Sequence, residues 1–232
     1  MLYLVGRIVK PNARLTGMPP TRKYEQRLRA KAADQTRRRI LDAVYQCLIE
    51  APSEQVGMDK VAKLAEVSRS TIYTVFGSRA GLFDALGMDL LHRGGFTDMV
   101  GAVLQPDARR GLRDGITGNV RMYAAHRDVL RALFSMAHLD ADAVGGTVRR
   151  LEDGRAQGMD DLARRLHDQG ALRDGLTAGD AGHLLWLHTS FDAFDLLHSG
   201  RSLPADTVAA LLADAAEHAL CRPSDTPSST GG

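Results

Sequence analysis

The chain has 232 residues, of which 44% are hydrophobic, 25% are charged and 5% are aromatic, a composition typical of a folded globular protein rather than a disordered or fibrous one. No stretch approaches the ~18 consecutive apolar residues that a membrane-spanning helix needs, so no membrane partner is expected. The two cysteines, Cys47 and Cys221, lie far apart, which excludes a disulfide framework and favours a cytoplasmic location.

The net charge of +2 conceals an uneven distribution along the chain. Residues 1–80 hold 15 of the 30 Lys and Arg but only 7 of the 28 Asp and Glu, so the remainder holds 15 basic residues against 21 acidic ones. A basic N-terminal third indicates a part that binds a polyanion such as DNA. A solvated basic tail is the alternative, because many of these basic residues precede Asp34, and charge alone leaves the choice open.

Residues 1–33 are basic and rich in Pro, and we expect a flexible N-terminal extension there, at least as far as Thr21. The extension lacks the basic region and cleavage site of a secretory signal, and we hypothesise that native translation starts at Met18. Asp34 is predicted to cap a helix that ends near Ala51, because a proline follows. The apolar residues of that helix recur at helical spacing: Ile40, Ala43, Val44, Cys47 and Leu48.

The next segment has the pattern of a helix-turn-helix. Two short helices are predicted at about residues 58–65 and 68–76, followed by a longer one over 79–93, with Ser68 and Ser78 as N-caps. Two short helices with a brief connection and one shared apolar face leave the outer face of the second helix free to enter a DNA major groove.

After residue 100 the sequence stays helical, with glycines between the segments. The predicted helices lie at about 107–127, 128–141, 147–169, 178–199 and 204–220. The fold class is therefore all-α.

The candidate DNA contacts lie on the outer side of the second short helix and on the segments beside it. Arg can form a bidentate pair with guanine, and Ser or Thr can contact base edges or phosphates. The candidate residues are Arg69, Ser70, Thr71 and Thr74, with Tyr73 and Arg79 flanking them and with Arg37 and Arg38 on the first helix. For Arg37 and Arg38, a solvated helix face is the competing interpretation.

These residues resemble the N-terminal domain of the TetR (tetracycline-repressor-type) family of transcriptional regulators. The resemblance covers roughly residues 35–91 and implies a transcriptional regulator, most often a repressor, that works as a homodimer. It rests on Val61-Ala62, on Ala65-Glu66-Val67-Ser68, on Thr71-Ile72-Tyr73 with Phe76, and on Ser78-Arg79 before Leu82-Phe83.

The sequence departs from the family pattern at three positions. Glu66 replaces the glycine of the turn, so we expect a strained turn. Val75 stands where the family often has a His or Tyr that touches the DNA backbone, and Thr74 replaces a frequently basic residue. The basic residues before Asp34 can compensate for these phosphate contacts.

The segment Leu184–Leu187 is apolar on all sides and therefore needs cover on every side. Burial inside one domain would supply that cover, but a partner subunit is favoured because reading a palindrome takes two copies spaced by ~34 Å. We therefore expect a homodimer formed through about residues 178–220. His188, Asp192 and Asp195 fall on one helical face, which predicts a His–Asp hydrogen bond.

The resemblance also implies an unidentified small-molecule effector. One or two residues of a short set of candidates are expected to line its pocket between helices: Phe134, His138, Trp186 and Phe191. No metal site or cofactor is predicted. An enzyme is not predicted, because G-x-x-x-x-G-K-[ST], G-x-S-x-G and H-E-x-x-H are all absent from the sequence.

The sequence thus predicts a helix-turn-helix DNA-binding domain at 34–93, a helical ligand-binding and dimerisation domain at 94–221, and a disordered tail at 222–232. The predicted function is that of a cytoplasmic DNA-binding regulator that acts as a ligand-responsive repressor on a pseudo-palindromic operator. Two alternatives stay open: a DNA-bound helical protein that senses no ligand, and a helical-bundle small-molecule binding protein or enzyme with an incidental basic N-terminal part.

Overall fold

The computed structural model of the chain describes residues 22–223. The predicted flexibility before Thr21, the hypothesised start at Met18 and most of the predicted tail lie outside the described residues. The chain divides into two compact units that meet inside the first helix, since one unit ends at Arg37 and the other begins at Arg38.

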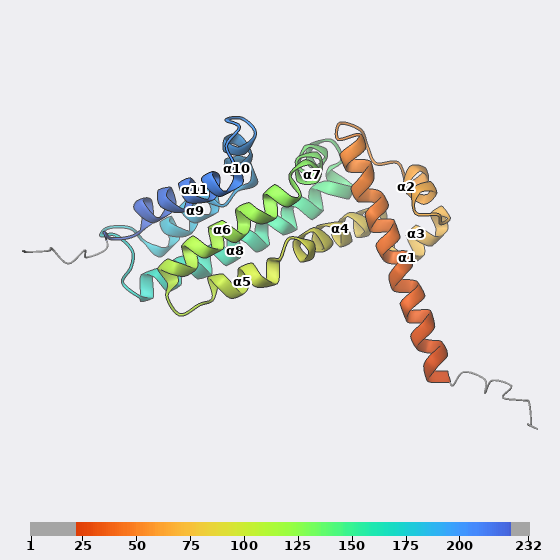
Figure 1. Cartoon of the computed structure of the whole chain (residues 1–232), viewed down its shortest axis with the longest axis horizontal. Coiled ribbons are helices and arrows are strands. Elements are labelled where there is room, and N and C mark those ends of the chain that lie inside the picture. The colour runs from red at the N-terminus through yellow and green to blue at the C-terminus, as the bar shows by residue number, and fades with distance from the viewer. Residues whose placement is uncertain (1–21, 224–232) are drawn as a thin grey trace, which may run out of the picture. The chain divides into compact units, whose positions relative to one another are not determined.

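The described part is built of helices joined by turns and loops, so the all-α prediction is confirmed (Figure 1). A π-helical turn, η1 (Ala141–Gly145), interrupts the series of α-helices. The α-helices are α1 (Arg22–Glu50), α2 (Met58–Leu64), α3 (Arg69–Phe76), α4 (Arg79–Arg93), α5 (Phe96–Val103), α6 (Ala108–Ala125), α7 (Arg127–Leu139), α8 (Gly146–Asp168), α9 (Ala178–His188), α10 (Phe191–His198) and α11 (Ala205–Leu220). No helix between residues 22 and 223 is long and apolar enough to cross a membrane.

Helices α2 and α3 form the predicted helix-turn-helix, and their ends are set by local hydrogen bonds. The Ser68 hydroxyl accepts from the backbone N–H of Thr71 at 3.1 Å, and the Ser78 hydroxyl accepts from that of Gly81 at 2.9 Å, so both predicted N-caps are confirmed. Glu66 has φ +55° in the connecting turn, which confirms the strain expected where a glycine is replaced.

One apolar core holds these helices to the C-terminal part of α1 and to α4. Its buried residues include the predicted stripe of α1, with Ile40, Val44 and Leu48 fully buried. Val61 of α2, Ile72 of α3 and Leu82 of α4 belong to the same cluster. Because this core takes the inner side of α3, the outer side of that helix is left to solvent.

The remaining helices pack against one another and continue the same apolar cluster. Helix α6 packs against α5 and α11, and α8 packs against α9 (Figure 1). Tyr123 of α6 contacts both Phe191 and Phe194 of α10, with ring centroids 5.4 Å and 5.8 Å apart. Burial raises the pKa of Tyr123 to about 12, so its hydroxyl stays protonated and donates to the Thr189 carbonyl at 3.1 Å.

The prediction of one helix over 178–199 was wrong, because the chain breaks between α9 and α10. The Thr189 carbonyl is taken by the side chains of Asn119 and Tyr123 at 2.8 Å and 3.1 Å instead of by a backbone N–H one turn later. The Ser190 hydroxyl then caps α10 by accepting from the N–H of Ala193 at 3.1 Å. Tertiary contacts therefore end a helix that the local sequence would continue.

Two further boundaries and two further elements differ from the sequence prediction. Helix α1 begins at Arg22, so Asp34 lies inside it and does not cap it, and residues 22–33 are helical. Helix α5 and the turn η1 were not predicted. The predicted tail starts too early, because the N–H of Arg222 donates to the carbonyl of Ala171 at 2.9 Å.

Candidate functional site

The outer side of α3 carries most of the side chains predicted to read DNA. Arg69, Ser70, Tyr73 and Thr74 are exposed, whereas Ile72 on the opposite side is buried. Helical spacing therefore separates a core face from a polar face on the same eight residues. The outer face presents Arg69, Ser70, Tyr73 and Thr74 and no large aliphatic side chain, which suits a groove of DNA.

Local contacts hold these side chains without burying them. Arg69 lies 3.4 Å from Asp59 of α2, and the two side chains are 55% and 83% exposed, so the pair is weak and easily exchanged for another partner. Hydrogen bonding to Tyr73, followed by the Asp59 charge, raises the pKa of Arg69. Thr74 donates to the Ser70 carbonyl at 2.9 Å. Thr71 is half-buried, with its hydroxyl 2.9 Å from that of Ser68.

Arg79 does not lie on this outer face. Its guanidinium donates to Asp140 at 2.9 Å and 3.2 Å and to the Val56 carbonyl at 2.6 Å. The arginine and aspartate side chains are 26% and 16% exposed. The guanidinium forms an ion pair that joins the start of α4 to the end of α7. The predicted phosphate contact of Arg79 is therefore a hypothesis that competes with this structural role.

Arg37 and Arg38 are exposed on α1, at the boundary between the two compact units. Their exposure fits both interpretations given above, and their contact with the DNA backbone stays a prediction.

The four residues predicted to line a ligand pocket do not gather around one cavity. Phe134 and Phe191 stack at 5.3 Å, and Phe191 is buried in the core. His138 is exposed in the last turn of α7. Trp186 is 43% exposed, with the Arg155 guanidinium 5.0 Å from its ring. None of the four lines the large cleft described next, and their contact with a ligand stays a prediction.

That cleft, which we call the junction cleft, has a volume of about 720 Å³. It is lined by Tyr45 and Ile49 of α1, by residues 124–129 around the α6–α7 turn, and by residues of the α10–α11 loop between His198 and Pro204. All of these residues belong to the second compact unit. The cleft thus brings α1, which packs with the helix-turn-helix, next to the α6–α7 turn and the α10–α11 loop.

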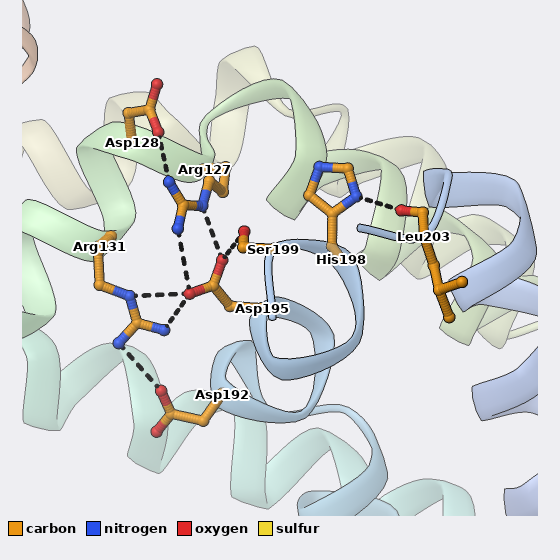
Figure 2. A network of polar contacts seen from close by, with 8 residues as sticks. All are labelled: Arg127, Asp128, Arg131, Asp192, Asp195, His198, Ser199 and Leu203. Atoms are coloured by element: carbon orange, nitrogen blue, oxygen red, sulfur yellow. Dashed lines mark hydrogen bonds and ion pairs between the residues drawn. The ribbon is translucent and has the colours of Figure 1, made fainter. Parts of the chain in front are cut away.

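A network centred on Asp195 fixes one wall of the junction cleft (Figure 2). Arg127 and Arg131 donate to its carboxylate at 2.7 Å and 2.6 Å, and the Ser199 hydroxyl donates at 2.6 Å. Burial alone would raise the pKa of Asp195, but the hydrogen bonds from these three residues outweigh it and lower the pKa to about 2. The carboxylate therefore stays ionised and holds both guanidinium groups in place.

Tyr45 and His126 link α1 to the α6–α7 turn on another side of the cleft. The Tyr45 hydroxyl lies 3.0 Å from Nδ1 of His126, and the two rings meet edge to face. Burial lowers the pKa of His126, and the nearby Arg93 guanidinium lowers it further, which favours the neutral ring. Its Nε2 atom is buried without a hydrogen-bond partner among the described residues.

The sequence signalled only part of this arrangement. Asp192 and Asp195 were singled out by their helical spacing, but both pair with arginines of α7, while Nδ1 of His188 donates to the Leu184 carbonyl at 2.7 Å. The predicted His–Asp bond is therefore not formed within the described chain. Within residues 22–223, no group of three His, Cys, Asp or Glu is arranged to hold a metal ion.

Comparison with known proteins finds similarity to transcriptional regulators. Residues 40–86 match the model of the family described as bacterial regulatory proteins, tetR family. A curated relative from Bacillus subtilis strain 168, the uncharacterized HTH-type transcriptional regulator YdeS, is 26% identical over 161 residues, which cover 68% of this chain and 73% of the relative.

Two solved structures share the fold. NalD, the secondary repressor of the MexAB-OprM multidrug efflux pump in Pseudomonas aeruginosa, aligns with a TM-score of 0.63 at 20% identity, over 83% of this chain and 98% of that one. A transcriptional regulator from Saccharomonospora viridis in complex with choline aligns with a TM-score of 0.62 at 20% identity, over 82% and 100% of the two chains.

Proposed function

We propose that the chain is a member of the TetR family of transcriptional regulators, whose model matches residues 40–86, and that it is a ligand-responsive repressor that binds a pseudo-palindromic operator in the cytoplasm as a homodimer. The observation that carries the proposal is the outer face of α3, where Arg69, Ser70 and Thr74 are exposed while Ile72 anchors the helix. Such a helix can enter the major groove with its polar side toward the base edges.

Exposed apolar side chains support the homodimer. Four large ones lie on α9, α10 and α11, and their exposure is costly in water unless another surface covers them. They are Trp186, Leu187, Leu196 and Leu211, which are 43%, 58%, 71% and 47% exposed. A second copy of the same helices supplies matching apolar surface, and two linked copies present two α3 helices to successive turns of DNA.

The similar proteins support regulation by a small molecule. NalD is named as a repressor of an efflux pump, and the Saccharomonospora regulator was solved with choline. We propose that this chain also releases its operator when an effector binds the helical part. The effector shifts the equilibrium only by its difference in affinity between the two states, typically ~1–3 kcal/mol.

A gel-shift assay at ~150 mM salt tests the proposal, because non-specific binding to the phosphate backbone is weak at that ionic strength. The purified full chain should bind DNA from the region upstream of its own gene at least ~1000-fold more tightly than random DNA of the same length. Equal affinity for both DNAs would contradict the proposal.

A further inference from the structure

The junction cleft is the place where a small molecule would contact the DNA-binding part and the remaining helices at once. Tyr45 and Ile49 belong to α1, whose buried residues pack with α2 and α3 in one core. The other walls come from the α6–α7 turn and the α10–α11 loop. A molecule bound here would therefore act directly on the spacing between α1 and these turns, which makes the cleft suited to an effector.

Hydrogen bonding leaves an acceptor on His198. Its Nδ1 lies 2.7 Å from the Leu203 carbonyl, and since a carbonyl only accepts, Nδ1 carries the proton. In the neutral ring Nε2 is then an acceptor, and Figure 2 shows that nitrogen directed away from Leu203. Stacking on Phe194 at 5.0 Å holds the ring in this orientation.

A carboxylate on the rim provides the second feature. The side chain of Asp128 is 69% exposed and contacts Nη1 of Arg127 at 2.8 Å. Arg127, the cation of the lining, is already bound by the Asp195 carboxylate at 2.7 Å. The lining therefore offers an accessible negative group and no uncompensated positive one.

The wider surroundings of the cleft also carry more carboxylates than guanidinium groups. Arg131 contacts Asp192 as well as Asp195, and Arg93, whose guanidinium lies 5.8 Å from the Tyr45 ring centroid, pairs with Asp42 and Asp89. The ion pairs around the cleft contain the guanidinium groups of Arg93, Arg127 and Arg131 and the carboxylates of Asp42, Asp89, Asp128, Asp192 and Asp195. Arg201, exposed in the α10–α11 loop, adds a fourth cation, so the carboxylates still outnumber the guanidinium groups. This excess disfavours an anionic ligand and favours a cation.

Apolar side chains complete the lining. Ile49, Val129 and Leu203 stand beside the polar groups, so a ligand with a hydrocarbon part can bury it there. We propose that the junction cleft binds a small organic amine in its protonated form, with the ammonium group at Asp128, a second N–H or O–H donor at Nε2 of His198, and the hydrocarbon part between them. The amine is the effector of the repressor, so the proposal rests on the proposed function.

Four probes of similar size test the charge and the second donor separately by isothermal titration calorimetry on the full chain at pH 7.5. Tyramine carries both an ammonium and a hydroxyl group, 2-phenylethylamine lacks the hydroxyl, tyrosol is neutral, and 4-hydroxyphenylacetate is an anion. Tyramine should bind most tightly, 2-phenylethylamine and tyrosol each at least ~5-fold more weakly, and the anion not at all. Equal binding of the four, or no binding of tyramine at 5 mM, would overturn the proposal.

The variant Asp128→Asn locates the site. It should weaken tyramine about two- to fivefold, as expected for an exposed ion pair, and leave tyrosol unchanged. Asp153→Asn, which removes the same charge from an exposed position on α8, should affect neither probe. Equal effects of the two variants would contradict the location, and circular dichroism melting shows whether both variants fold.

Operator binding without any probe separates this proposal from the proposed function. If the chain binds its operator but tyramine neither binds nor releases it, only the amine proposal fails. If the chain shows no operator preference at all, the proposed function fails whatever the probes do.

Discussion

Arg69 stands at the exposed start of α3, where its guanidinium contacts Asp59 at 3.4 Å and also interacts with Tyr73. A pair of this kind is worth at most ~1 kcal/mol, so exchanging it for a bidentate pair with guanine costs little. We expect Arg69→Ala to reduce the preference for operator over random DNA by about 1–3 kcal/mol, measured by fluorescence anisotropy. Arg121→Ala, which removes an exposed arginine from α6, is the matched control, and the same loss in both variants would argue against base reading by Arg69.

Asp195 connects protonation to the stability of the fold. Its pKa in the folded chain is lowered from 3.8 to about 2, which corresponds to about 2 kcal/mol of stability. Because the folded pKa lies below the unfolded one, this contribution is fully present above about pH 4 and is lost as the pH falls toward 2. Urea unfolding should therefore show Asp195→Asn to be destabilised at pH 7 and the deficit to shrink between pH 4 and 2. Asp192→Asn, at an exposed position, should show no comparable pH dependence.

At the scale of elements, Arg79 joins the start of α4 to the α7–η1 junction rather than facing outward with α3. Its pair with Asp140 is largely shielded from water, and it also donates to the carbonyl of Val56. Losing such a partly buried pair costs about 1–3 kcal/mol. We expect Arg79→Gln to lower the free energy of unfolding by that amount, while the slope of log affinity for DNA against log salt concentration stays unchanged. A slope reduced by ~0.9 with unchanged stability would instead show that Arg79 neutralises a phosphate.

The elements that could be predicted from sequence are those whose ends are set locally. Ser68 and Ser78 cap the helices that directly follow them, so the helix-turn-helix and the outer face of α3 could be derived from the residues alone. The break at Thr189 depends on Asn119 and Tyr123, which lie 70 and 66 residues away in the chain. Such contacts leave no local pattern.

The candidate ligand site was missed for the same reason. The junction cleft is built from three segments that are distant in sequence, and its network pairs Asp195 with Arg127, 68 residues earlier. Of the aromatic residues that stand out in the sequence, Phe191 is buried in the core, whereas Trp186 is exposed but does not line the cleft. Aromatic residues therefore did not indicate where this cleft lies.

For the whole molecule, the proposed repressor depends on two DNA-binding parts being linked through α9–α11. Leu187 of α9 and Leu211 of α11 are 58% and 47% exposed, and the two helices contact each other within one chain. A charge at each position would have to be desolvated in a dimer but stays in water in a monomer, so the double variant Leu187→Glu, Leu211→Glu should shift the dimer to monomer in sedimentation experiments. Operator affinity should fall by about 100-fold or more, since the second half-site then loses the effective concentration that linkage provides. Met88→Glu, which places the same charge at a 64% exposed position on α4, should leave the dimer intact. A double variant that remains dimeric would mean that the subunits associate through another surface.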